Sequence, residues 1–278
     1  MPVEGLTPAG DVKIPSTASD GDASFVAGAV PLDADGERLG VSGNPLRTLV
    51  CSGCTETRQI IGRNGAVTGV ETVWLAGGLY PWGAWDTPGV LVIVSDDALD
   101  VDVEITLEGL DADGEPVTET LTTDALDGTT PVTGLTTFAR LNAAYVSNGV
   151  NMQSGATITV TRGGTTVAQI EAAYQTATMG VYSVPAGFTA EILSARWVPG
   201  KSDELTASVR VRESGGVFRA RDVVEVYDGP TAYEYGRPDV PRSGLLVGER
   251  GDIELRADRV AGGSAVLSGG VVVVLRPA

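Results

Sequence analysis

The stretch Val101-Asp102-Val103-Glu104-Ile105-Thr106-Leu107 decides the fold class, because apolar and polar residues alternate strictly along it. Such alternation places the apolar side chains on one face of a β-strand and the charged ones on the other. The turn sequence Asp111-Ala112-Asp113-Gly114 comes next, followed by Val117-Thr118-Glu119-Thr120-Leu121-Thr122. Two such runs on either side of a turn predict a β-hairpin.

Short strand-like segments of the same kind recur along most of the chain. They cover residues 90–94, 138–146, 156–161, 166–171, 189–198, 205–212, 217–226 and 265–275. The run 90–94 is continuously apolar, which is typical of a strand covered on both faces. No window shows three turns of helical periodicity. The sequence therefore predicts an all-β protein with two antiparallel β-sandwich or jelly-roll-like domains.

Charge divides the chain into parts. The 278 residues carry 36 acidic and 19 basic side chains and no histidine, a formal charge of −17. No basic residue lies between Arg63 and Arg140, whereas the two signs nearly balance from Glu191 onward. We therefore predict an N-terminal arm over 1–48, an acidic β-sandwich over 49–177 and a second, nearly neutral sandwich over 178–278.

The arm has five prolines and scattered apolar residues without a period, so we expect it to be extended and unable to form its own core. It is either a flexible tail or a strap that becomes ordered on a neighbouring subunit. Its apolar residues favour the strap and are candidate interface positions: Val12, Ile14, Phe25, Val26, Val30 and Leu32.

Composition excludes several kinds of chemistry. Without histidine, no Ser-His-Asp or Cys-His mechanism is possible. The negative charge disfavours a nucleic-acid partner. We see neither a signal peptide nor the roughly 20 apolar residues of a membrane span.

Cys51 and Cys54 are too few ligands for zinc unless a symmetric oligomer shares the ion, so we interpret them as a tight turn that could close into a disulfide. No cofactor and no enzymatic activity are predicted.

The acidic motifs could bind calcium or supply catalytic carboxylates, but they can also be explained as turns or as solvated surface. Asp-Ala-Asp-Gly-Glu occurs at 33–37 and 111–115, and it supplies only part of a calcium shell while suiting a hairpin turn well. The acidic run from Asp96 to Glu108 could supply a pair of hydrolytic carboxylates. Because Asp102 and Glu104 fall on the same face of the predicted strand, we interpret the run as solvated surface.

Aromatic residues are few, and four of them are concentrated in one short segment: Trp74, Tyr80, Trp82 and Trp85. Three interpretations stay open for them. The rings could fill the open end of the first sandwich, anchor a protein interface, or stack on the sugar rings of a host glycan.

Several longer phrases resemble structural proteins of tailed bacteriophages, in particular those of marine phages. They lie at 33–47, 92–97, 107–120, 138–146 and 179–187. The resemblance covers most of residues 30–275 and implies a catalytically silent, β-rich, oligomeric virion component assembled in the host cytoplasm. We expect a capsid decoration or cement protein that forms a homotrimer and contacts the major capsid protein or other virion proteins. The alternative is a tail or head-fibre component that contacts a host glycan.

Overall fold

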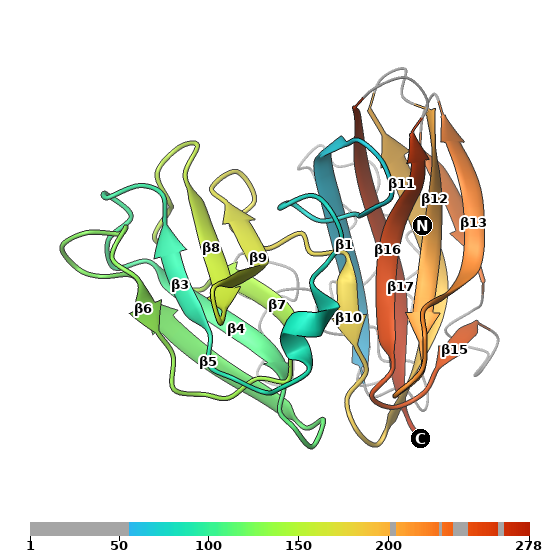
Figure 1. Ribbon diagram of the computed structural model, residues 1–278, viewed down its shortest axis with the longest axis horizontal. Coiled ribbons are helices and arrows are strands. Elements are labelled where there is room, and N and C mark those ends of the chain that lie inside the picture. The colour runs from blue at the N-terminus through green and yellow to red at the C-terminus, as the bar shows by residue number, and fades with distance from the viewer. Residues whose placement is uncertain (1–55, 201–203, 228–229, 236–243, 261–263) are drawn as a thin grey trace, which may run out of the picture. The chain divides into compact units, whose positions relative to one another are not determined.

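The computed structural model describes residues 56–200, 204–227, 230–235, 244–260 and 264–278. These residues form β-strands and a short 3₁₀ helix, η1 (Trp82–Trp85), so the all-β prediction is confirmed (Figure 1). No helix in the described ranges has the length and apolar character needed to cross a membrane. The predicted arm over 1–48, with its six candidate interface residues, lies outside the described residues, and so do Cys51 and Cys54.

The strands, in chain order, are β1 (Glu56–Val67), β2 (Glu71–Thr72), β3 (Val92–Ser95), β4 (Glu104–Leu110), β5 (Pro116–Thr122), β6 (Val132–Thr133), β7 (Arg140–Val146), β8 (Thr157–Arg162), β9 (Thr165–Glu171), β10 (Val181–Ser183), β11 (Phe188–Pro199), β12 (Glu204–Arg212), β13 (Arg219–Tyr227), β14 (Thr231–Glu234), β15 (Leu245–Val247), β16 (Asp252–Val260) and β17 (Ala265–Pro277).

The first sandwich contains β3 to β9, coloured green to yellow in Figure 1. One sheet has the order β6-β3-β8-β9 and the other the order β5-β4-β7, with antiparallel pairing throughout. Their inner faces enclose a fully buried apolar core that includes Ile93, Leu107, Phe138, Ile158 and Ile170. Burial of these side chains is the main term that holds the two sheets together.

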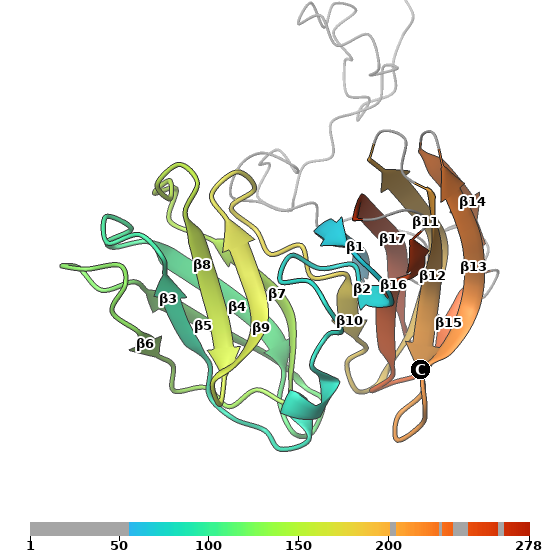
Figure 2. The same cartoon turned by 45° about the horizontal axis from the view of Figure 1, so that its top comes forward.

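The second sandwich combines the two ends of the described chain. Its sheets have the orders β1-β17-β11-β14 and β10-β16-β12-β13, while β15 pairs with β11 and β2 with β16 (Figure 2). The core between them includes Ile192, Trp197, Val209, Leu255 and Val273. Alternation along β12, which buries Leu205, Ala207, Val209 and Val211, follows the pattern predicted from the sequence.

Strand pairing divides the chain differently from the predicted ranges 49–177 and 178–278. β1 pairs with β17 over almost its whole length, and β2 pairs with β16, so both early strands belong to the second sandwich. The first sandwich is thus an insertion between β2 and β10. Local composition could not reveal this arrangement, because β1 and β17 are about 200 positions apart. Leu49–Ala278 together form one compact unit.

Glycine is required where the chain leaves the second sandwich and returns to it. Gly62 of β1 forms a β-bridge with Met179, directly before Gly180. A Cβ atom on Gly62 would lie 2.1 Å from the Val73 carbonyl oxygen, and one on Gly180 would lie 2.2 Å from the same atom. Gly180 also has a φ of +60°, which L side chains rarely adopt. Only glycine allows the three backbone segments to approach this closely.

The hairpin predicted from the opening stretch is present, with a later start. β4 begins at Glu104 instead of Val101, because Asp102 has a left-handed φ of 54° that interrupts the strand. Asp102 and Glu104 therefore do not share one strand face. From Glu104 onward β4 pairs with β5 without a register shift.

Candidate functional site

The aromatic segment that the sequence singled out is mostly core. Trp74, Tyr80 and Trp85 are only 4, 4 and 3% exposed and belong to the core of the first sandwich. The Trp85 Nε1–H donates a hydrogen bond to the Tyr80 hydroxyl at 3.2 Å, and the Tyr80 ring meets Trp74 edge-on at 5.1 Å. For these three rings the core interpretation is confirmed, and an exposed interface or sugar platform is wrong.

Tyr80 is held in its neutral form by its surroundings. Complete burial raises the pKa of its phenol well above the ordinary value, although the hydrogen bond from Trp85 and the charge of Arg140 act in the opposite direction. A neutral phenol between two indole rings acts as a packing and hydrogen-bonding group. Tyr80 therefore contributes to the fold of this segment.

Trp82, the fourth ring, is half-buried and faces the second sandwich. It contacts Tyr80 at 4.8 Å between ring centroids and Phe218 at 5.1 Å. The Arg212 guanidinium lies 4.9 Å from the Trp82 centroid and 4.6 Å from that of Phe218. The guanidinium and the two rings thus form a triangle of mutual contacts. A cation close to aromatic rings is a favourable arrangement, and here it links η1 to β12.

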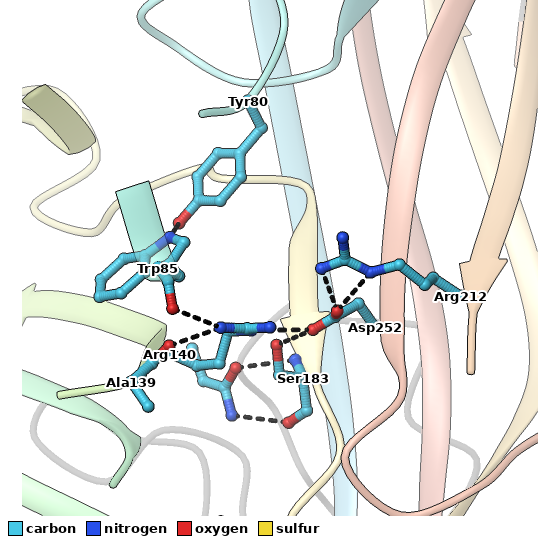
Figure 3. Close-up of polar contacts among 8 residues, drawn as sticks. Tyr80, Trp85, Ala139, Arg140, Ser183, Arg212 and Asp252 are labelled. Atoms are coloured by element: carbon cyan, nitrogen blue, oxygen red, sulfur yellow. Dashed lines mark hydrogen bonds and ion pairs between the residues drawn. The ribbon is translucent and has the colours of Figure 1, made fainter. Parts of the chain in front are cut away.

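A buried carboxylate, Asp252 at the start of β16, lies at the centre of the polar contacts (Figure 3). It is 2% exposed, and the Arg140 Nε donates to its Oδ1 at 3.2 Å. The Arg212 Nε donates to Oδ2 at 2.8 Å, and the Arg212 Nη2 and the Ser183 hydroxyl donate to the same carboxylate. Four charge-assisted hydrogen bonds compensate the cost of burying this charge. We refer to Asp252, Arg140, Arg212 and Ser183 as the Asp252 cluster.

The Asp252 cluster joins the two sandwiches, since Arg140 lies on β7 and the other three residues lie on β10, β12 and β16. Four further hydrogen bonds run alongside it. The Asn142 side chain donates to the Ser183 carbonyl at 2.9 Å and accepts from the Ser183 amide at 2.8 Å. The Arg140 Nη1 donates to the carbonyl oxygens of Ala139 at 2.7 Å and Trp85 at 3.4 Å.

A second ionic contact connects the sandwiches through Glu108 of β4. The Arg58 Nη1 of β1 lies 3.1 Å from the Glu108 Oε2, and the Tyr145 hydroxyl donates to the Glu108 Oε1 at 2.9 Å. Earlier in the acidic run, Asp100 is 1% exposed and accepts hydrogen bonds from the Ser95 hydroxyl and the Gln153 amide. The run is therefore only partly solvated surface, because these two members are structural.

A pocket of about 420 Å³ opens beside the Asp252 cluster. Its charged lining residues are Asp86, Asp111, Arg140, Arg212, Arg250 and Asp252. Three arginines would ordinarily attract a carboxylate or phosphate ligand. In this protein the Asp252 carboxylate already occupies the position between two of the guanidinium groups, and the three acids balance the three arginines. The geometry therefore supports cross-linking of the sandwiches more directly than it supports anion binding.

The second Asp-Ala-Asp-Gly-Glu motif is a turn. The Asp111 Oδ1 accepts hydrogen bonds from the amides of Asp113 at 2.8 Å and Glu115 at 2.9 Å, and Gly114 has a φ of 79°. These are the backbone reasons for which hairpin turns use Asp and Gly. Among the described residues, no group of three or more Asp, Glu, Cys or His side chains is placed to hold a metal ion. The first copy, at 33–37, lies outside the described ranges.

The sequence did not indicate the Asp252 cluster. Its members come from four strands, and Arg140 and Asp252 are 112 positions apart. The one available signal was that Arg140 is the first basic residue after Arg63. Such an isolated charge inside an acidic region suggests a partner carboxylate, but not which of the chain's many acids it binds.

Comparison with known proteins does not assign the chain to a family. No family model and no curated protein matches the chain. Among solved structures there is a faint similarity to that of the infectious bursal disease virus Gx strain, with a TM-score of 0.15, 10% identity and 80% of each chain covered. T=1 particles derived from infectious bursal virus give a TM-score of 0.11 and 11% identity over 84% of this chain and 76% of that one. Scores this low carry no argument about function.

Proposed function

We propose that this protein is a non-enzymatic structural component of a virion, and in particular a capsid decoration protein. In this role it binds the head surface through its N-terminal arm and through contacts between its own subunits, arranged as a trimer. Its partner is the major capsid protein or another virion protein. The resemblance of residues 30–275 to tailed-bacteriophage structural proteins is one support for this proposal.

The observation that carries the proposal is the Asp252 cluster. A decoration protein must transmit load between subunits without deforming. Here a carboxylate that is 2% exposed receives two arginines from different sandwiches, and the Arg58–Glu108 ion pair adds a second cross-link. Removing one member of a buried ion pair costs several kcal/mol, so the two sandwiches resist separation. Asp252, the buried acid that would be best placed for catalysis, therefore serves as a structural group that binds two arginines.

Burial of the aromatic segment bears on the fibre alternative. A glycan platform needs exposed rings on which sugars can stack, and three of the four candidate rings are at most 4% exposed. Trp82 alone retains partial exposure, and its faces contact Tyr80, Phe218 and Arg212. These contacts favour the decoration role over host-glycan recognition.

The test is a binding assay with capsids assembled without this protein. We expect the full chain to co-sediment with them and to raise the temperature at which they release DNA. Removal of residues 1–47, which leaves every described strand in place, should reduce binding at least tenfold. Unchanged binding by the truncated chain, or no binding by the full chain, would discard the proposal. A W82A variant should bind capsids as well as the parent does.

A further inference from the structure

The strand β13 lies at the edge of its sheet. It pairs with β12 on one side and with no other described strand, and Figure 1 shows it in orange at the margin of the sheet. An edge strand offers unpaired amide and carbonyl groups that can pair with another strand. Val223 and Tyr227 on β13 are 56 and 65% exposed, which leaves apolar surface beside that edge.

From Arg221 to Tyr227, exposed residues of β13 alternate with half-buried or buried ones. Val224 and Val226 enter the core of the second sandwich, whereas Arg221, Val223 and Glu225 are exposed. Arg221 and Glu225 therefore flank Val223 on the outward side, one with a positive and one with a negative charge. The strand carries opposite charges at equal distances from a central apolar residue.

This pattern is complementary to itself. When two copies of β13 run antiparallel about a two-fold axis at Val223, each Val223 faces its counterpart. Each Arg221 then faces the Glu225 of the other copy, which forms two symmetric ion pairs. Isologous contacts of this kind need a surface that matches itself under the two-fold operation. Opposite charges directly across an antiparallel pair are stabilising, and like charges are destabilising.

We propose that β13 pairs edge to edge with β13 of a second copy of this chain, centred on Val223. The inference does not depend on the proposed virion role, and its two-fold contact is separate from the proposed trimer. The nearly balanced charge from Glu191 onward allows two copies to approach here despite the overall charge of −17. Arg221 is available, since its ion pair with Glu213 is 4.0 Å long and both side chains are about half exposed.

The contact is short and therefore weak. The β12–β13 register shifts between Asp222 and Ala220, which places Arg221 at the bulge and at the end of the regular pairing. Bulges of this kind limit the length over which an edge strand can pair. We expect a reversible association, which covalent capture detects better than a mass measurement does.

Capture uses the full chain with Val223→Cys in a background of Cys51→Ser and Cys54→Ser. Residues facing each other in an antiparallel pair have Cβ atoms about 4.5–5.5 Å apart, close enough for a disulfide or a short bis-maleimide. One cysteine per chain yields linked pairs from any oligomer, so capture shows that two Val223 positions meet, and the charge reversals described next test the two-fold register. Val70→Cys is the matched control because Val70 is 55% exposed. We expect pairs from Val223→Cys at least tenfold faster; equal rates would overturn the proposal.

Charge reversal tests the register itself. In the Val223→Cys background, R221E and E225R should each slow capture about tenfold, since each places like charges opposite one another. The double variant R221E/E225R restores opposite charges with their positions exchanged and should recover the parent rate within about threefold. Equal melting temperatures for all four chains will show that they are folded. Failure of the double variant to recover would overturn the two-fold register.

Discussion

Arg140 of β7 and Asp252 of β16 lie on different sandwiches, and their side chains meet with the Arg140 Nε 3.2 Å from the Asp252 Oδ1. This contact fixes the inserted sandwich to the one that encloses it in sequence. Because Arg212 binds the same carboxylate from β12, one acid connects two neighbouring strands of one sheet to the inserted sandwich. The stability of the whole unit should therefore depend strongly on this one side chain.

Asp252→Asn should lower the free energy of unfolding by about 3 kcal/mol, because it removes the charge while two guanidinium groups stay in place. Urea denaturation followed by tryptophan fluorescence measures the change. Glu204→Gln on β12, an exposed position, serves as the control and should alter stability by less than about 0.5 kcal/mol. If the Asp252 variant were as stable as the control, the cross-linking role would be wrong.

Gly62→Ala should destabilise the protein by about 3 kcal/mol or prevent folding, since its methyl group would overlap the Val73 carbonyl. Gly65→Ala on the same strand is the matched comparison. A Cβ there has the Arg63 side chain as its nearest neighbour, at 3.9 Å, and no backbone atom in the way. Thermal unfolding of the pair measures the difference. Similar melting temperatures would contradict the close backbone approach described for Gly62.

Glu71 should make stability depend on pH in the acid range. Partial burial raises the pKa of its carboxyl, but hydrogen bonds from the Gly78 and Thr68 amides, the Thr68 hydroxyl and Asn64 outweigh that effect and lower the pKa to about 2. A carboxyl whose pKa is depressed on folding stabilises the native state above its unfolded pKa. That contribution is lost as the pH falls toward the folded pKa.

Glu71→Gln should therefore be less stable than the parent by about 2 kcal/mol at pH 7. The gap should narrow between about pH 5 and pH 2 and close at the acid end of that range. Urea titrations at a series of pH values measure it. A gap that stays constant with pH would show that the lost stability comes from packing and not from the ionised carboxylate.

Trp82→Ala should cost about 2 kcal/mol of stability, because the half-buried ring packs against Tyr80 and Phe218 and underlies the Arg212 guanidinium. Trp82→Phe keeps an aromatic face in that place and should recover at least half of the loss. Denaturant unfolding of the two variants gives the comparison. Unchanged stability in the alanine variant, together with lost binding to host cells, would instead favour the fibre alternative.

Local patterns identified the strands well where one face of a sheet is buried. The hairpin of β4 and β5 and its turn followed from alternation and from the preference of Asp and Gly for turns, which are properties of neighbouring residues. The run 90–94 was less informative. Its continuous apolar character predicts a strand covered on both faces, yet the structure buries Leu91 and Ile93 completely and leaves Val90 at 38% exposure. A continuous apolar run does not reveal how much of each face is covered.

By itself, the sequence determined the all-β class, the position of many strands and the exclusion of histidine chemistry, because these depend on composition and on the two-residue period of a strand. Only the tertiary structure decided that β1 completes a sheet with β17, that the first sandwich is an insertion, and that Asp252 receives two arginines. These features depend on contacts between residues far apart in the chain. Many acids could have paired with Arg140, and only the packing of four strands brings Asp252 within reach.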